Sequence, residues 1–408
     1  MSPAIKRHMS HADLYRYYIF TVMPRLVRED SLSKYADQSH MRELALKFPP
    51  LMGAMIAIAA MHLSRSDALY TQVAVESYLY SIHGLQESIA HNECAGNEDG
   101  LLATAISLCI FEVRSYHQVV GYIINQVLQN SRSDAPPNIN PHVTAAGTLL
   151  ALRHPNRQTR SSAAAAFERI CVESFVYHSA LMMLFHPSLD PLASPKIRID
   201  LERYFTDPVH LDDTGSGTSV STQPILDRSY TFFLLIADIT RLARTSRSLS
   251  AMECIQWHGL RGELAQWETI INRSEQDHCR NHSGVLCAVA ARILLQKTDP
   301  EVSTDEAVSE MQKHLGVGLS LLASLDTDRV FTNYYLWPLT ILGSISVRPS
   351  DQQVIRENMT RLGVSRPVGQ ANWVLTRLER VWKCTLNSSE PWKAHHTPQG
   401  LQLLLNGA

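Results

Sequence analysis

The chain has 408 residues, of which 45% are hydrophobic and 19% are charged, so it can bury a sizeable core and is not globally disordered. Its 37 basic and 39 acidic residues leave a net charge of −2, which gives no overall attraction to nucleic acid or to a membrane surface. The seven cysteines are scattered, which indicates reduced intracellular thiols rather than a disulfide framework. We expect no secretory signal, because Arg16 interrupts the apolar stretch near the start.

The stretch Pro50–Leu63 is the most apolar part of the chain, and no charged residue lies between Phe48 and Ser64. A helix that is apolar on all sides lies inside a large protein or inside a membrane. This stretch is shorter than the roughly 20 apolar residues that a bilayer span needs. We therefore expect a central core helix, with Pro50 in its first turn.

Apolar residues recur at helical spacing through most of the remaining chain, and no run shows the period-two alternation of a strand. In the first helical stretch, 11–30, Pro24 is expected to bend or break the helix. A second strongly apolar helix is expected over 101–111, with Asp99 as its N-cap. Further helices are predicted over 74–89, 142–152, 167–185, 226–247, 251–272, 284–297, 304–325, 330–347, 351–363 and 371–386. The sequence therefore predicts an all-α fold.

Three stretches stand apart from this helical pattern. Residues 131–141 are rich in proline and serine and read as a loop, and residues 206–224 are rich in glycine, serine and threonine and read as a mobile connection. Near the end of the chain, Leu401, Leu404 and Leu405 form one apolar stripe of a short helix with L-x-x-L-L spacing. Short helices of this spacing dock in apolar grooves of partners. The stripe is thus a candidate partner-binding site, although packing on the protein's own core would use the same residues.

One cluster has metal-ligand side chains close together in the sequence: His278, Cys279, His282 and Cys287. The two histidines have the i, i+4 spacing that places both imidazoles on one helical face. However, Ser283–Gly284 is expected to end or bend the helix, and no C-x-x-C pair supports the cluster. We interpret these residues as ordinary polar residues at a helix end and predict no metal site.

No motif for catalysis or cofactor binding is present. The glycines at 215–217 and 316–318 follow no predicted strand and precede no Lys-Ser/Thr pair, so they match neither phosphate-binding fingerprint. The acidic pair Asp212–Asp213 has no third acid at helical spacing, as Mg²⁺-dependent chemistry on a diphosphate would need. His62, in the central helix, is interpreted as a hydrogen-bonded core residue. We predict no catalytic residue and no cofactor.

Two groups of arginines are candidates for a nucleic-acid interface. One group is Arg241, Arg244 and Arg247, and the other is Arg153, Arg157 and Arg160. Both are short and flank no known binding motif, so solvated or salt-bridged faces are the favoured interpretation.

Several segments resemble, in order, successive helices of the fungal-specific transcription factor domain, the regulatory region of Zn₂Cys₆ regulators. The resembling segments are Pro50–Leu63, Ala74–Leu85, Leu101–Glu112, Val172–His178, Arg292–Leu295, Leu336–Gly343 and the tryptophan at Trp382. The resemblance covers roughly residues 45–386 and implies an irregular multi-helix bundle of that type. It divides the chain into an N-terminal helical segment, 1–44, the regulatory domain, 45–386, and a C-terminal tail, 387–408.

The chain departs from this family in two ways. The binuclear zinc cluster needs six cysteines that begin with a C-x₂-C pair, but the first cysteine here is Cys94 and the closest pair is Cys279 and Cys287. We therefore expect a regulator that acts without its own zinc cluster, which puts direct DNA binding in doubt. Residues 114–140 form an atypical insertion, either a real one or a translated intron.

The resemblance implies a nuclear, non-enzymatic regulator of a fungal gene set, with a secondary-metabolite cluster as the expected pathway class. The implied partners are a DNA-bound transcription factor or the transcription machinery, and no membrane is involved. An alternative is an effector-sensing module that binds a pathway metabolite. A further alternative, a helical biosynthetic enzyme, needs ionisable residues that converge in one pocket, and the sequence displays none.

Overall fold

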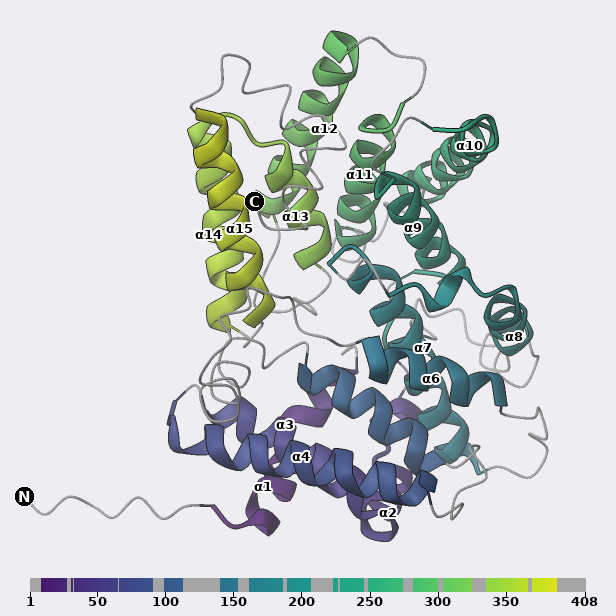
Figure 1. The fold of residues 1–408 in the computed structure, drawn as a ribbon, viewed down its shortest axis with the longest axis vertical. Coiled ribbons are helices and arrows are strands. Elements are labelled where there is room, and N and C mark those ends of the chain that lie inside the picture. The colour runs from purple at the N-terminus through teal and green to yellow at the C-terminus, as the bar shows by residue number, and fades with distance from the viewer. Residues whose placement is uncertain are drawn as a thin grey trace, which may run out of the picture. The chain divides into compact units, whose positions relative to one another are not determined.

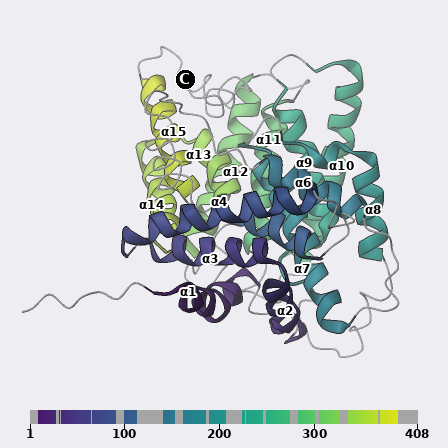
Figure 2. The ribbon, with the colours of Figure 1, turned by 60° about the horizontal axis from the view of Figure 1, so that its bottom comes forward.

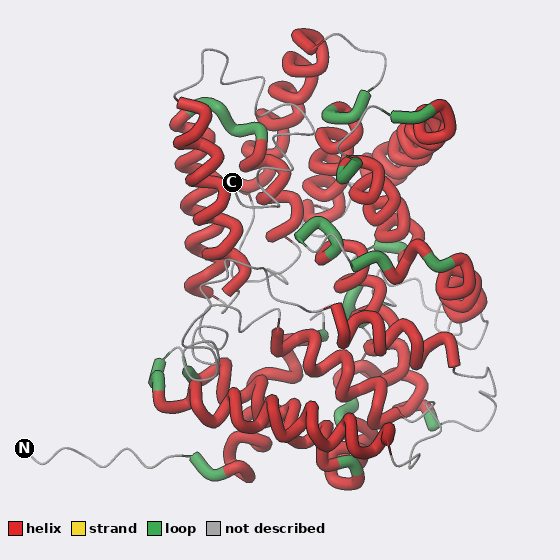
Figure 3. The backbone as a smooth tube through the Cα atoms, viewed as in Figure 1, coloured by secondary structure: helices red, strands yellow, loops and turns green. Residues whose placement is uncertain are grey.

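A computed structural model shows that the chain folds into helices joined by turns and loops (Figure 3). It describes residues 9–27, 31, 33–64, 66–90, 99–112, 140–152, 161–185, 189–206, 223–226, 228–245, 249–273, 282–299, 304–324, 335–365 and 369–386. These residues contain no β-strand, so the predicted all-α fold class is confirmed.

The chain divides into two compact units. Unit 1 consists of Met1–Ser131, Pro141–Phe175 and Ile199–Ile225. Unit 2 consists of Arg132–Asn140, Val176–Arg198 and Leu226–Ala408. The boundaries between the two units after Phe175 and after Arg198 fall within the helices Ser162–Met182 and Pro195–Thr206. The division into 1–44, 45–386 and 387–408 stays a prediction.

Unit 1 is built around the predicted core helix, α3 (Pro49–Leu63). Its residues are buried on all sides, with Leu51, Met55 and Ala59 at 0% exposure, and its two prolines occupy the first turn as expected. Its neighbour α4 (Leu69–Ala90) lies along it in both ribbon views (Figures 1 and 2). The absence of a side chain at Gly53 permits this close approach, because a Cβ there would lie 2.9 Å from Tyr80 Cδ1.

The N-terminal helical stretch changes its winding before Pro24. The α-helix α1 (His11–Tyr17) becomes a π-helical turn over Tyr18–Val22 and then a 3₁₀ turn over Met23–Leu26. Proline lacks the N–H that would continue the α-helical ladder. The α-helical winding thus ends at Tyr17, before Pro24, and 3₁₀ winding continues through Pro24 to Leu26.

Unit 1 also contains helices that the sequence pattern did not predict. They are α2 (Ser39–Lys47) and α8 (Pro195–Thr206), which also carries the last residues of a unit 2 segment. The predicted second apolar helix is present over 99–112, but Asp99 is itself helical rather than an N-cap. Its carboxylate instead lies 2.9 Å from Nε2 of His40 in α2, a tertiary contact that a local capping rule does not include.

The helix α7 (Ser162–Met182) holds a buried ion pair in unit 1. Arg169 Nε donates to Glu173 Oε1 at 2.6 Å, and Glu173 is fully buried. The other oxygen, Oε2, accepts from the Ile225 N–H at 2.8 Å, while the Arg169 guanidinium lies 4.3 Å from the ring centroid of Phe205. The pair thereby joins α7 to Phe205 in α8 and to the backbone at Ile225. The remaining described helix of unit 1 is α6 (Asn140–Leu152).

Unit 2 is a bundle in which α11 (His282–Gln296) contacts four other helices. These are α9 (Tyr230–Ala243), α10 (Ala251–Arg273), α12 (Thr304–Ser324) and α13 (Leu336–Ser344). Every residue of α13 is buried. The hairpin of α14 (Pro349–Ser365) and α15 (Gly369–Leu386) packs on α13, where the Trp382 indole N–H donates to the Gly343 carbonyl at 3.0 Å.

Several predictions lie outside the described residues. They concern the loop at 131–139, the connection over 207–222, the insertion over 114–139 and the stripe of Leu401, Leu404 and Leu405. Among the described helices, none alone is long and apolar enough to cross a membrane. One bent pair, Ser33–Lys47 with Pro49–Leu63, passes on length and composition only.

Candidate functional site

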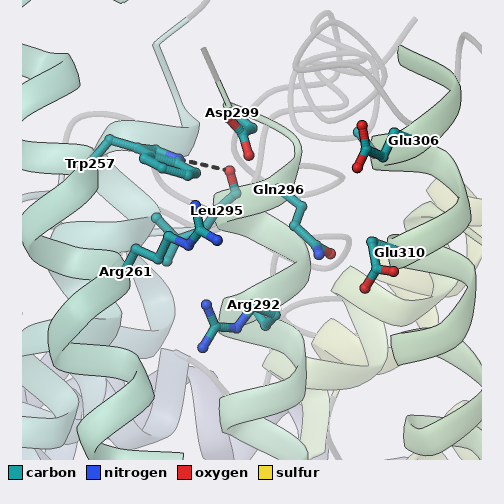
Figure 4. Close-up of a pocket in the computed structure, with 9 residues that line it drawn as sticks. Trp257, Arg261, Arg292, Leu295, Gln296, Asp299, Glu306 and Glu310 are labelled. Carbon is teal, nitrogen blue, oxygen red and sulfur yellow. Dashed lines mark hydrogen bonds between the residues drawn. The ribbon is translucent and has the colours of Figure 1, made fainter. Parts of the chain in front are cut away.

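The candidate site is a hollow of about 220 Å³ in unit 2, formed by α10, α11, α12 and the turn after α11 (Figure 4). It is lined by Trp257, Arg261, Arg292, Leu295, Gln296, Asp299, Glu306, Ala307 and Glu310. The three helices come together because each presents an apolar face to its neighbour, and the polar residues at the edges of these faces surround the hollow.

An anchored indole forms the α10 side of the hollow. Trp257 is 1% exposed, and its indole N–H donates to the Leu295 carbonyl near the end of α11 at 2.9 Å. Arg261 is one turn further along α10, and its guanidinium lies 5.4 Å from the Trp257 ring centroid. This cation–π contact holds a positive charge at the rim.

On the α11 side of the hollow, one side-chain amide oxygen is buried and accepts no hydrogen bond from the described residues. The Oε1 atom of Gln296 has no hydrogen-bond partner among the described residues and is shielded from solvent. Figure 4 shows the side chain extending from α11 towards α12, where Glu306 and Glu310 lie. A buried acceptor without a donor costs about 1–3 kcal/mol, so a ligand that donates a hydrogen bond here would recover that cost.

Charges of opposite sign lie on opposite sides of the hollow. Arg292 is neutralised by a bidentate pair with Glu268, with N–O distances of 3.1 and 2.5 Å. Glu310 is paired with Lys313, and this hydrogen bond lowers the pKa of Glu310. Arg261 and Glu306, in contrast, form no ion pair with any described residue. Arg261 and Glu306 are thus not neutralised by any charge of the described residues.

The lining offers charged and polar side chains to a ligand, and Glu310 is not suited to act as a general acid. No histidine or cysteine lines the hollow, and no group of three metal-ligand side chains occurs among the described residues. The lowered pKa keeps Glu310 ionised near neutral pH, whereas a general acid must carry a proton there. The hollow does gather ionisable side chains, which the sequence did not display, because they come from three separate helices.

The family model described as the fungal specific transcription factor domain matches residues 13–405. The chain belongs to this family. No curated protein and no solved structure matches the chain. The resemblance recognised in the sequence is thus confirmed, and membership of the fungal transcription factor domain family gives the protein a role in transcription regulation.

In this fungal transcription factor domain, one member of the His278–Cys287 cluster, for which no metal site was predicted, can be placed. Cys287 is 3% exposed within α11, while His278, Cys279 and the side chain of His282 lie outside the described residues. Gly316 and Gly318 lie in the interior of α12. Their counterparts in the loop, Gly215–Gly217, and the pair Asp212–Asp213 lie outside the described residues.

Of the arginine cluster at the end of α9, Arg241 is salt-bridged, which agrees with the favoured interpretation for this residue. Arg241 contacts both oxygens of Asp190, at 2.5 and 2.7 Å, and also pairs with Asp238. Arg244 donates to the Met183 carbonyl at 2.9 Å. The other members of the two clusters, Arg247, Arg153, Arg157 and Arg160, lie outside the described residues. The hydrogen bond expected of His62 is present, since its Nδ1 lies 2.8 Å from the Tyr17 hydroxyl, but the residue is half-buried rather than in the core.

Lys297 is one of several buried ionisable groups in this domain that the sequence pattern did not predict. Lys297 follows α11 and is 5% exposed, and its Nζ donates to Ser344 Oγ at 3.0 Å. Burial lowers its pKa to about 7. In sequence, a lysine at a helix C-terminus is the ordinary partner of the helix dipole, so no local signal marks it as buried.

Proposed function

We propose that this protein regulates transcription of a fungal gene set from the nucleus, by contacting a DNA-bound transcription factor or the transcription machinery. The family match over residues 13–405 carries this proposal. We propose a secondary-metabolite gene cluster as the target, because similar stand-alone regulators often control such clusters. The role is non-enzymatic, and the regulatory domain over 45–386 performs it.

Two observations favour protein partners over direct DNA contact by these 408 residues. No two cysteines have the C-x₂-C spacing with which the zinc cluster of the family begins. The guanidinium of Arg241, which sequence reasoning considered for DNA, is already paired with two aspartates. A neutralised arginine adds little to the phosphate contacts on which nucleic-acid affinity depends.

The experiment is transcript profiling of a deletion strain, combined with chromatin immunoprecipitation and a binding assay on naked DNA. We expect transcript changes in a coherent gene set and occupancy at its promoters, without binding of the purified protein to the same promoter DNA. Unchanged transcripts would refute the regulatory role. Tight, sequence-specific binding to naked DNA would instead refute the dependence on partners.

The hollow supports a second function, the sensing of a small polar effector. A molecule with one anionic and one cationic group would pair with Arg261 and Glu306 and could donate a hydrogen bond to Gln296. Binding to the folded state raises its stability, by an amount that grows with the logarithm of the ligand concentration relative to the dissociation constant. We expect a thermal shift with some zwitterionic metabolites of a panel, and loss of that shift in Arg261→Ala and Glu306→Ala. The control is Lys383→Ala, an exposed change on α15. A panel without any shift, or equal shifts in all variants, would reject this function.

A further inference from the structure

The helix α10 carries apolar side chains on two opposite faces. One face packs on unit 2 through Trp257, Leu260, Leu264 and Ile271, which are at most 6% exposed. The other face carries Met252, Ile255 and Ile270, which are 74%, 66% and 53% exposed. A helix at the edge of a bundle needs only one apolar face. The second face is therefore available for a contact outside unit 2, and contiguous exposed apolar area marks interaction sites.

Two glycines occupy the middle of this second face. No described atom lies within 4 Å of a Cβ built at Gly259 or Gly262, and both positions are exposed. Glycine is the poorest helix former after proline, and packing within unit 2 does not require it at either position. By contrast, a Cβ at Gly343 would lie 2.7 Å from Leu378. An open glycine pair instead permits the backbone of another helix to approach closely.

The two outermost exposed apolar residues of this face, Met252 and Ile270, are placed symmetrically about its glycine pair. Met252 and Ile270 are separated by about 27 Å along the helix, and the point midway between them falls beside the glycine pair. If a second α10 lies antiparallel across the glycines, Met252 of each copy meets Ile270 of the other. Such self-complementary matching is the property of an isologous two-fold interface.

We propose that α10 pairs with α10 of a second copy of this chain, antiparallel, with Gly259 and Gly262 at the crossing point. This self-association is separate from the proposed function and does not depend on it. It commits the exposed apolar face to one occupant, a second copy, because Met252 and Ile270 lie at equal distances from the point beside the glycine pair and so exchange places when the helix is reversed.

The positions of the apolar residues also select the crossing angle. Met252 lies about 13 Å from the crossing point. At a crossing angle of about 20° the two axes diverge there by about 5 Å, whereas at about 50° they diverge by about 11 Å. A methionine side chain spans the smaller gap but not the larger one. We therefore infer the shallow crossing that is typical of antiparallel helix pairs.

Two features limit the affinity. The exposed apolar area of this face is on the order of a few hundred Å² per copy, against about 800 Å² per partner in a stable interface. The arrangement also brings the two exposed Glu263 side chains within about 6 Å of each other along the axis. We expect a reversible dimer with a dissociation constant in the micromolar range, which Glu263→Gln tightens several-fold.

The test is charge complementation, followed by sedimentation of the full chain over about 1–200 μM. Met252→Glu and Ile270→Lys should each abolish the dimer, because each places two charges against apolar groups. An equimolar mixture of the two variants should restore a dimer, since one end then pairs glutamate with lysine and the other keeps methionine against isoleucine. Leu46→Glu is the matched control, because Leu46 is also 74% exposed but lies on α2, and it should leave dimerisation unchanged.

A second variant separates association from folding. Gly259→Ala with Gly262→Ala should raise the thermal midpoint, since alanine favours the helix, and should weaken the dimer at least tenfold by blocking close approach. A wild-type chain that stays monomeric throughout the concentration range would overturn the proposal. So would a mixture of the two charged variants that stays monomeric, which would assign the face to another occupant, such as the Leu401–Leu405 stripe of the same chain.

Discussion

The buried lysine of unit 2 leads to a quantitative prediction. Lys297 has one hydrogen bond, to Ser344 Oγ, and desolvation lowers its pKa to about 7. In Lys297→Met an apolar side chain of similar length fills the same space. The Ser344 hydroxyl remains satisfied, because it donates to the Ile341 carbonyl at 2.7 Å. We expect this variant to be more stable than the wild type at neutral pH.

The magnitude follows from the pKa difference between the two states. In the unfolded chain a lysine has a pKa near 10.4, so between pH 7 and about 10 the unfolded state binds a proton that the folded state does not. Stability of the wild type therefore rises with pH over this window. The cost of burying the lysine is about 4 kcal/mol at pH 7 and falls to about 2 kcal/mol at pH 9. The advantage of Lys297→Met should shrink by the same amount.

Tryptophan fluorescence is the suitable probe, because all six tryptophans lie in the sequence after residue 226 and so report on unit 2. Urea unfolding at pH 7, 8 and 9 should show the stability difference between variant and wild type narrowing with pH. Lys313→Met is the control, since Lys313 is 68% exposed, and its difference from wild type should not narrow. A constant difference for Lys297→Met across this range would refute the assigned desolvation of Lys297.

Other substitutions test the packing of both units. Glu173→Gln should destabilise unit 1 by about 3–5 kcal/mol, because it leaves the Arg169 charge buried and unpaired. Far-UV circular dichroism during denaturation would measure this loss of stability. A loss below about 1 kcal/mol would contradict the buried ion pair. Within α12, Gly316→Ala should stabilise by about 0.5–1 kcal/mol, since no described atom lies within 4 Å of the added Cβ. Gly318→Ala should instead cost about 1–3 kcal/mol, since its Cβ would lie 2.8 Å from Leu342 Cδ2. Thermal midpoints that move in the same direction for both glycine variants would count against the packing of α12 on α13.

The local sequence was sufficient where one face of a helix is strongly apolar or where every face is. The core helix α3 was predicted because it has no polar face at all. The short helix α2 escaped prediction because only two of its residues, Met41 and Ala45, are buried. Two apolar residues four positions apart are too few to distinguish a helical periodicity from chance.

The amino-acid sequence by itself determined the all-α class, most of the helices and the family, because these depend on the periodicity and order of apolar residues along the chain. Only the tertiary structure decided which side chains meet. It brought Arg261, Gln296 and Glu306 around one hollow, it buried Lys297, and it left Met252 and Ile270 of α10 uncovered. A periodic pattern states that a face is apolar, but whether that face is covered depends on neighbours that are distant in the sequence.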